Sequence, residues 1–413
     1  MAGTEILQEA IKDHDKIIKD RRYLHTHPGT GFDIEETVAY VKKALMDMGY
    51  DPQPCGKAGL VALVGGKKPG KVFMLRGDMD ALPMVEEADV DEPSTNGKMH
   101  ACGHDFHTSM LLEAARLLKV HEDEIEGTVK LMFQPAEEIF EGAQDMIHSG
   151  VLKNPEVDAA LMMHVMAGMP FSAGTAIVCD GGVSAPAADY FTIKVQGKGC
   201  HGSMPNVGVD PINVAAHMIT ALQTIHAREL ALSDEAILTI GSIHGGSVGN
   251  VIPDCVEMQG SIRTYDEAVR GFMKERMVSI VENIAASFRA EATVSFGSGC
   301  PTLVNDASLS NCVVQYIQEL NGTGSAFTAG QLAALSGAKK VAKTAGSEDF
   351  AYVSQEVPSI MLALAAGHPE KGYIYPQHHP KVKFDEAALP VGAAIYAYTA
   401  MRWLQDQRHQ SKA

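Results

Sequence analysis

The sequence lacks several features that would place it in a specialised class of protein. It has no apolar run that approaches the roughly 18 residues needed to cross a membrane, so we expect no membrane span. Positive charge is scarce, since 34 lysine and arginine residues stand against 51 aspartate and glutamate residues, for a formal net charge of −17. A field of this sign repels phosphate backbones. We therefore expect the protein to bind no nucleic acid.

Cysteine is also scarce, and its positions do not suggest disulfide bonds. The seven cysteines are odd in number and widely scattered, whereas a disulfide framework has an even set at close spacing. The first residues read as a charged amphipathic helix without the apolar segment of a signal peptide. We therefore expect reduced thiols and a cytoplasmic protein.

The length and the hydrophobic pattern predict an α/β protein of about two domains. The chain has 413 residues, which is too long for one ordinary core. Between residues 35 and about 180, apolar runs typical of buried strands alternate with helical patterns. The helical pattern at 105–124 has Asp105 as a candidate N-cap. This alternation predicts a mostly parallel sheet with helices on its faces.

The pattern changes near residue 187. The stretch ADYFTIKVQGKG alternates with a period of two, as a half-exposed antiparallel strand does. Two long amphipathic helices and three further strands follow before residue 298, and the strand-and-helix pattern then resumes towards the C-terminus. We therefore predict a discontinuous α/β domain at 1–186 and 299–413, with an inserted α+β domain at 187–298.

Polar residues that can bind metals follow the predicted strands of the first domain. Asp78, Asp80, Glu137 and Glu138 come just after strands, His164 ends one, and Cys102 and His104 lie in the loop before the helix at 105. In open parallel sheets the active crevice lies beyond the carboxyl ends of the strands, so we expect these side chains to converge. Cysteine, histidine and glutamate are ligands of zinc and similar divalent ions. In the pair Glu137–Glu138, one carboxylate could bind metal while the other acts as general base.

Each of these residues also has a structural interpretation. A lone buried cysteine is usually inert, a glutamate pair after a strand is usually a solvated helix start, and a histidine ending a strand is usually a core residue. A second alternative is a nucleophilic Cys102 activated by a neighbouring histidine. That mechanism would leave the glutamate pair and the distal histidines without a role, so the pattern favours a metal site.

The motifs together resemble a known family. They occur in the family's order and span nearly the whole chain: RRYLHTHPGTGF, LRGDMDALP, HACGHDFHTSMLL, FQPAEE, GKGCHGSMP, DPINVAA, GSIHGGSVGNVIPD, GSIRTYD, AGSEDFAY and HHPKVKFDEAALPVGA. The chain resembles N-acyl-amino-acid amidohydrolases of the aminoacylase and metallo-carboxypeptidase superfamily, in the subfamily of hippurate hydrolases and plant auxin-conjugate hydrolases. The resemblance implies a zinc-peptidase-like catalytic domain and a ferredoxin-like lid and dimerisation domain.

The resemblance implies a site for two divalent metal ions, which could be zinc, manganese, cobalt or nickel. The implied ligands are Cys102, His104, Glu138, His164 and His378. We choose His378 over His379 because the subfamily's ligand sits two residues before the proline at 380.

The same resemblance assigns roles to two acids near the ligands. Glu137 would be the general base, and Asp80 matches an aspartate that orients a ligand. Asp78 stands where more distant relatives carry a metal-binding histidine. We interpret His25 and His27 as structural residues, and His100 and His107 as structural residues or neighbours of ligands.

The inserted domain would contribute three further residues. His201 matches a histidine that polarises the scissile carbonyl and often reaches into the partner subunit's active site. Asn250 and Arg263 match positions that hold the substrate carboxylate, for which the donor fork of arginine is suited. The resemblance also implies a homodimer or a higher homo-oligomer formed through the lid domain.

The implied reaction is hydrolysis of the amide between an acyl group and an amino acid, with a small N-acyl amino acid as substrate. A metallo-dipeptidase or carboxypeptidase using the same site is the alternative, and a catalytically inactive binding protein of the same fold is a third. The sequence departs from the subfamily after the glutamate pair, where residues 139–141 read IFE in place of a run of glycines. We expect this bulk to reshape the acyl pocket.

Overall fold

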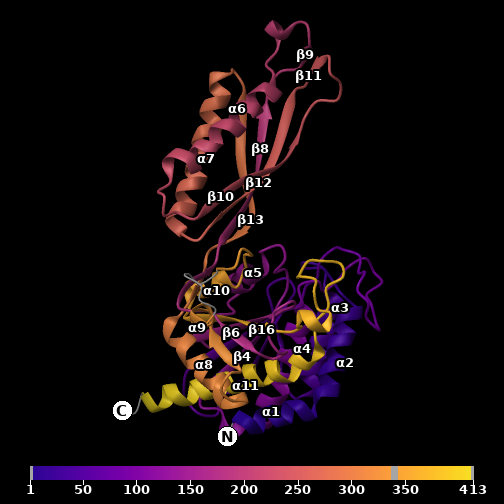
Figure 1. Ribbon diagram of the computed structural model, residues 1–413, viewed down its shortest axis with the longest axis vertical. Coiled ribbons are helices and arrows are strands. Elements are labelled where there is room, and N and C mark those ends of the chain that lie inside the picture. Colours follow the sequence, from indigo (N-terminus) through magenta and orange to yellow (C-terminus); the bar gives the residue numbers. More distant parts are fainter. Residues whose placement is uncertain (1–2, 336–342, 411–413) are drawn as a thin grey trace. The chain divides into compact units, whose positions relative to one another are not determined.

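The computed structural model describes residues 3–335 and 343–410, which form two compact units (Figure 1). Unit 1 comprises the described residues of Met1–Gly182, Val304–Lys343 and Asp349–Ala413. Unit 2 comprises Val183–Leu303 and Thr344–Glu348. The short strands β7 (Gly182–Ala185) and β14 (Leu303–Asn305) contain two of the points at which the chain passes between the units. Among the described helices, none is both long and apolar enough to cross a membrane.

Unit 1 is built on an eight-stranded mixed sheet with the order β1-β2-β4-β3-β5-β16-β6-β15. Its strands are β1 (Gln53–Cys55), β2 (Gly59–Gly65), β3 (Val72–Asp78), β4 (Thr128–Gln134), β5 (Ala159–Met166), β6 (Ala176–Val178), β15 (Ala326–Thr328) and β16 (Ser359–Ala365). The central strands β4, β3, β5 and β16 are mutually parallel, while β2 and β6 join them antiparallel. The predicted mostly parallel mixed sheet is therefore confirmed.

Helices cover this sheet because its central strands are buried along nearly their whole length and need an apolar layer on each face. The helices of unit 1 are α1 (Gly3–Lys12), α2 (His14–Thr26), α3 (Glu35–Asp47), α4 (His104–Val120), α5 (Gly142–His148), α8 (Ala307–Asn321), α9 (Ala329–Leu335), α10 (Ala351–Glu356) and α11 (Leu389–Gln410). Helices α1, α2, α4, α8 and α11 pack on one another as one layer (Figure 1). Helix α4 is almost wholly buried, and its first turn borders the carboxyl ends of β3 and β5.

The start of α4 differs from the prediction. The helix begins at His104, and Gly103 precedes it with a φ of +90°. A Cβ at Gly103 would lie 2.4 Å from the side chain of Val165, so both conformation and space require glycine there. Asp105 lies inside the first turn and accepts a hydrogen bond from Arg21 at 2.9 Å, so its prediction as N-cap was wrong. The α-helix also ends at Val120, before a 3-10 turn at Glu122–Glu124.

Unit 2 is a four-stranded antiparallel sheet with two helices. Its main elements are β8 (Ala187–Gln196), α6 (Pro211–Thr224), β10 (Ala236–His244), β12 (Cys255–Thr264), α7 (Glu267–Ser287) and β13 (Glu291–Cys300), with a small pair β9 (Cys200–His201) and β11 (Val251–Ile252). Asp210 and Asp266 cap the two helices. The sheet order β10-β12-β8-β13 is the ferredoxin-like arrangement of a split βαβ unit, which confirms the predicted fold.

The buried side chain of Lys130 links the main sheet to a neighbouring loop, and we call this link the Lys130 clamp. This β4 residue is 1% exposed, and its ammonium group donates hydrogen bonds to the carbonyl oxygens of Val151, Lys153 and Pro155 at 2.7–2.8 Å. These three bonds match the three N–H donors of a lysine. They tie β4 to the loop that leads into β5.

We expect Lys130→Met to lower the free energy of unfolding by at least about 2 kcal/mol, because buried carbonyl groups lose their donors. Urea unfolding of unit 1 can be followed by the fluorescence of Trp403, the single tryptophan, which packs against Phe73. The control is Lys43→Met, which removes a highly exposed lysine and should change the free energy by less than about 0.5 kcal/mol. Equal stabilities of the two variants would contradict the clamp.

Candidate metal centre

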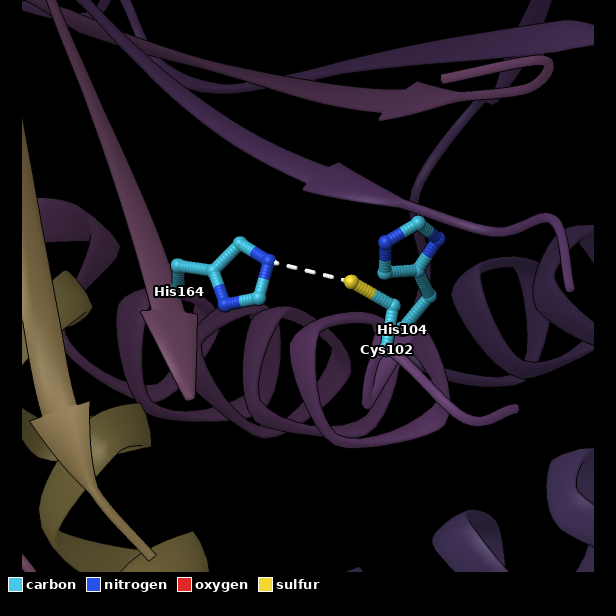
Figure 2. Close-up of side chains that lie close together, drawn as sticks. All are labelled: Cys102, His104 and His164. Atoms are coloured by element: carbon cyan, nitrogen blue, oxygen red, sulfur yellow. Dashed lines mark hydrogen bonds between the residues drawn. The ribbon is translucent and has the colours of Figure 1, made fainter. Parts of the chain in front are cut away.

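Polar side chains from separate strands meet at one edge of the main sheet. The parallel strands β3, β4 and β5 all end at this edge, and the loop before α4 lies against it. Figure 2 shows Cys102 and His104 from this loop and helix start facing His164 from β5. The convergence follows from the fold, because parallel strands bring their carboxyl ends to the same edge.

Within unit 1, the structure brings together all five residues predicted as metal ligands. The Cys102 Sγ lies 3.4 Å from His164 Nε2 and 3.3 Å from His378 Nε2. A Glu138 oxygen lies 3.5 Å from His378 Nε2, and the other lies 3.8 Å from His104 Nε2. Two ligands on one tetrahedral zinc ion are about 3.5 Å apart, given typical bond lengths and angles. The separations therefore fit shared coordination.

The hydrogen bonds of the histidines also fit metal binding. The Nδ1 of His104 lies 2.8 Å from the backbone oxygen of Asp80, and the Nδ1 of His164 lies 2.8 Å from the oxygen of Val165. A carbonyl oxygen only accepts, so each Nδ1 carries a proton, and Nε2 is the nitrogen of each ring that is left to bind a metal ion. His104 Nε2 is buried and makes no hydrogen bond. A divalent cation would satisfy this atom.

The charges around the centre attract a cation. Burial alone would lower the pKa of His104, but Asp78, Asp80 and Cys102 raise it well above its usual value. Burial raises the pKa of the Cys102 thiol to about 12, and Glu138 adds to this effect. A thiolate at this position needs a neighbouring cation to stabilise it. These surroundings disfavour the alternative in which Cys102 is an ionised nucleophile.

Asp80 fixes the backbone of the glutamate pair. Its two carboxylate oxygens accept hydrogen bonds from the backbone N–H groups of Glu137 at 3.0 Å and Glu138 at 3.2 Å. Asp80 thus orients both acids through their main chain. Its backbone oxygen also holds His104. Glu137 is 6% exposed, and one of its oxygens lies 3.9 Å from His104 Nε2.

The centre contains strained backbone. Ala136, Phe140 and His378 have φ values of 56°, 56° and 63°, in the left-handed region that side chains other than glycine rarely adopt. Ala136 and Phe140 belong to the turn at residues 136–142, which Gly142 closes. A Cβ at Gly142 would lie 1.6 Å from the oxygen of Pro135. Such strain persists where the surrounding structure imposes it, and it gathers at functional sites.

The two adjacent histidines near residue 380 differ in their surroundings. His378 faces Cys102 and Glu138, as described above. The ring of His379 instead stacks on Tyr375, with centroids 4.4 Å apart, and its Nδ1 accepts the backbone N–H of Lys381. The geometry therefore supports the choice of His378.

Asp78 binds side chains through both of its oxygens, whereas Asp80 binds backbone N–H groups. Arg76 donates to one oxygen at 2.6 Å, and His107 Nδ1 lies 2.6 Å from the other. Burial alone would raise the pKa of Asp78, but Arg76, His104 and His107 lower it well below its usual value. No role for Arg76 was expected from the sequence, and His107 was expected only as a structural residue or a neighbour of a ligand. Their signals were an arginine inside an apolar strand and a histidine one helical turn after His104.

The remaining predicted site residues belong to unit 2. His201 is exposed, and its Nδ1 accepts the backbone N–H of Ser203. Asn250 lies beside it, because its backbone oxygen accepts from Gly202 and the following residue pairs with His201. Arg263 lies on β12 and donates hydrogen bonds to Ser347 and to the hydroxyl group of Tyr190.

Comparison with known proteins identifies relatives over the whole chain. The chain is 37% identical to an N-acetyl-L-cysteine deacetylase from Bacillus subtilis over 399 residues, which cover 96% of this chain and 90% of that protein. It is 36% identical to thermostable carboxypeptidase 1 of Saccharolobus solfataricus, covering 97% and 98% of the two chains. It is 33% identical to IAA-amino acid hydrolase ILR1-like 2 of Arabidopsis thaliana, covering 95% and 86%.

Solved structures agree with these relatives. A candidate aminohydrolase from methicillin-resistant Staphylococcus aureus has a TM-score of 0.86 and 32% identity, with coverage of 97% of this chain and 99% of that chain. A dinuclear metal-binding peptidase of the M20 family from Bacillus subtilis has a TM-score of 0.74 and 31% identity, with coverage of 95% and 98%. The sequence also matches Peptidase family M20/M25/M40 over residues 74–402. The chain therefore belongs to peptidase family M20/M25/M40 and is a hydrolase, as the resemblance of its motifs predicted.

Proposed function

We propose that the protein is a metal-dependent amidohydrolase that cleaves N-acyl amino acids into a carboxylic acid and a free amino acid. The observation that carries this proposal is that Cys102 Sγ lies 3.4 Å from His164 Nε2 and 3.3 Å from His378 Nε2, beside the Glu137–Glu138 pair. Relatives named as an N-acetyl-L-cysteine deacetylase and as an IAA-amino acid hydrolase support amide hydrolysis.

We propose that two divalent ions are held at this centre. The proposed ligands are Cys102, His104, Glu138, His164 and His378. When bound, such ions polarise a carbonyl group and lower the pKa of water. The mixed nitrogen, oxygen and sulfur donors suit zinc, manganese, cobalt or nickel.

Glu137 is the residue that we assign to proton transfer. It is buried beside the proposed ligands, and Asp80 fixes its backbone. In this role the Glu137 carboxylate accepts a proton from the attacking water and later donates it to the leaving amine. Asp80 acts indirectly, by orienting both glutamates and the ring of His104.

Unit 2 is the proposed lid and dimerisation domain, and unit 1 the catalytic domain. In this assignment His201 stabilises the oxyanion that forms on the scissile carbonyl. Asn250 and Arg263 bind the carboxylate of the amino acid. We further propose a cytoplasmic homodimer whose lid closes on the substrate and excludes water.

A metallo-dipeptidase or carboxypeptidase is the second candidate function. The 36% identity to a thermostable carboxypeptidase favours it, as does the acid Glu141 in the turn after the glutamate pair. A dipeptide carries a free amine, which an exposed carboxylate at Glu141 could bind. An N-acyl amino acid has an amide in place of this amine, so it carries no positive charge there.

The variant Glu137→Gln tests the proton-transfer role. It keeps the size of the side chain but loses the base, so we expect kcat to fall by at least about 10²-fold. Metal content and the thermal unfolding temperature should stay unchanged. The control is Glu156→Gln, which alters a highly exposed acid and should keep full activity. Substantial turnover by Glu137→Gln would remove this residue from its role.

A substrate screen after metal removal separates the two candidate functions. We expect chelation to abolish hydrolysis, and addition of zinc, manganese, cobalt or nickel to restore it to different extents. Each dipeptide is compared with its N-acetylated counterpart, and kcat/KM should be higher for the acetylated compound. A preference for the free dipeptide would favour the peptidase, and full activity after chelation would contradict both.

The variant Phe140→Gly tests the expected effect of residues 139–141. Phe140 has a φ of +56°, and its N–H donates to the oxygen of Glu137 at 2.8 Å, so the side chain begins within one turn of the proposed base. We expect glycine to shift the ratio of kcat/KM for benzoyl and acetyl amino acids towards the larger acyl group. Phe140→Leu, which keeps bulk, serves as control. An unchanged ratio would show that Phe140 does not shape the acyl pocket.

A further inference from the structure

A buried chain of polar residues lies behind the candidate centre, and the ligand set does not explain it. Arg76 is 1% exposed, and Asp78 and His107 are fully buried. None of these three residues is among the proposed ligands. Burying a charged pair and a histidine costs free energy unless each group is hydrogen-bonded. The hydrogen bonds of Arg76, Asp78 and His107 therefore indicate what these residues do.

The hydrogen bonds of His107 fix a single tautomer. Its Nε2 accepts the backbone N–H of Val165 at 2.9 Å, which requires a lone pair on Nε2. The proton is therefore on Nδ1, which donates to Asp78 at 2.6 Å. His107 thus bridges the end of β3 to β5 with both ring nitrogens in use.

The residue whose N–H binds His107 also binds the proposed ligand His164 through its carbonyl oxygen. The N–H of Val165 donates to His107, while the carbonyl oxygen of Val165 accepts from His164 Nδ1 at 2.8 Å. The rings of His107 and His164 are also in edge contact, with centroids 4.7 Å apart and planes at 71°. His107 therefore constrains the ring of His164 in two ways, through one backbone residue and by direct packing.

Asp78 is in turn anchored from the other side. Its second oxygen accepts from Arg76 at 2.6 Å, and Arg76 also donates to Gln134 at 2.9 Å and to Asp349 at 3.1 Å. The guanidinium group pairs with the Asp78 oxygen that does not contact His107. Asp78 is thus held in the position from which it accepts a hydrogen bond from His107.

We propose that His107, anchored by Asp78 and Arg76, is a positioning residue that orients the metal ligand His164 through Val165. This inference rests on the proposed metal-dependent function. His107 touches neither substrate nor metal in this role. Residues that orient metal ligands affect metal affinity by about 10- to 100-fold when they are replaced.

Two amide variants distinguish positioning from simple core packing. In His107→Asn the amide nitrogen can still donate to Asp78, but the side chain is too short to reach the N–H of Val165. In His107→Gln the longer side chain can reach it. We expect His107→Asn to weaken binding of at least one ion by about tenfold or more, and His107→Gln to stay within about threefold of the original protein.

His100 provides the matched control. It is 3% exposed, lies in the same segment, and neither of its ring nitrogens makes a hydrogen bond. His100→Asn therefore replaces a buried histidine without breaking any hydrogen bond of Arg76, Asp78 or His107. We expect its metal affinity to stay within about threefold.

The measurement is a competition titration of the metal-free full-length proteins with Zn²⁺ against a chromophoric chelator, together with the Co²⁺ absorption spectrum. Weaker Zn²⁺ binding and an altered Co²⁺ spectrum in His107→Asn alone would support the proposal. Equal affinities for His107→Asn and His107→Gln, or equal losses in His107→Asn and His100→Asn, would overturn it. Failure of the original protein to take up two ions would instead overturn the proposed function on which the inference rests.

Discussion

Two buried carboxylates at the end of β3 hold the candidate centre together. Asp80 accepts the backbone N–H groups of both glutamates, and its own carbonyl oxygen fixes the tautomer of His104. Asp78 binds Arg76 on one side and His107 on the other. Because these bonds lie out of contact with water, each carboxylate has few alternative partners and the geometry is well defined. The strands supply the positions, and the two acids set the orientation of the side chains that face the cation site.

Asp78 and Asp80 orient different parts of the candidate centre. Asp80 controls the side of the centre that would transfer protons, where the turn at residues 136–142 is strained. Asp78 controls the side where His164 sits, through His107 and Val165. Arg76 pairs with Asp78 and also with Asp349. Against the effect of burial, Asp78, Asp80 and Cys102 raise the pKa of His104 well above its usual value, so the surroundings of this ring favour a cation.

Much of this arrangement could be predicted from the sequence, for physical reasons. Periodicity revealed the buried strands, and the convergence of their carboxyl ends follows from parallel topology. The role of Asp105 was missed because an acid near a helix start usually caps it, whereas here tertiary contacts with Arg21 and His25 determine its position. His107 was expected as a structural residue or a neighbour of a ligand, but its partners could not be predicted because they come from β3 and β5. Helical spacing shows which face a residue lies on, but it does not show what that face meets.

We propose that five residues from separate parts of the sequence form one dinuclear centre. Anomalous diffraction from crystals of the metal-loaded protein tests this most directly. Data collected at the absorption edge of zinc should contain two peaks in unit 1. Each should lie about 2.0–2.3 Å from donor atoms. The account predicts that these donors are Cys102, His104, Glu138, His164 and His378. Peaks bound by Asp78, His107 or His379, or an absence of peaks at this edge of the sheet, would contradict it.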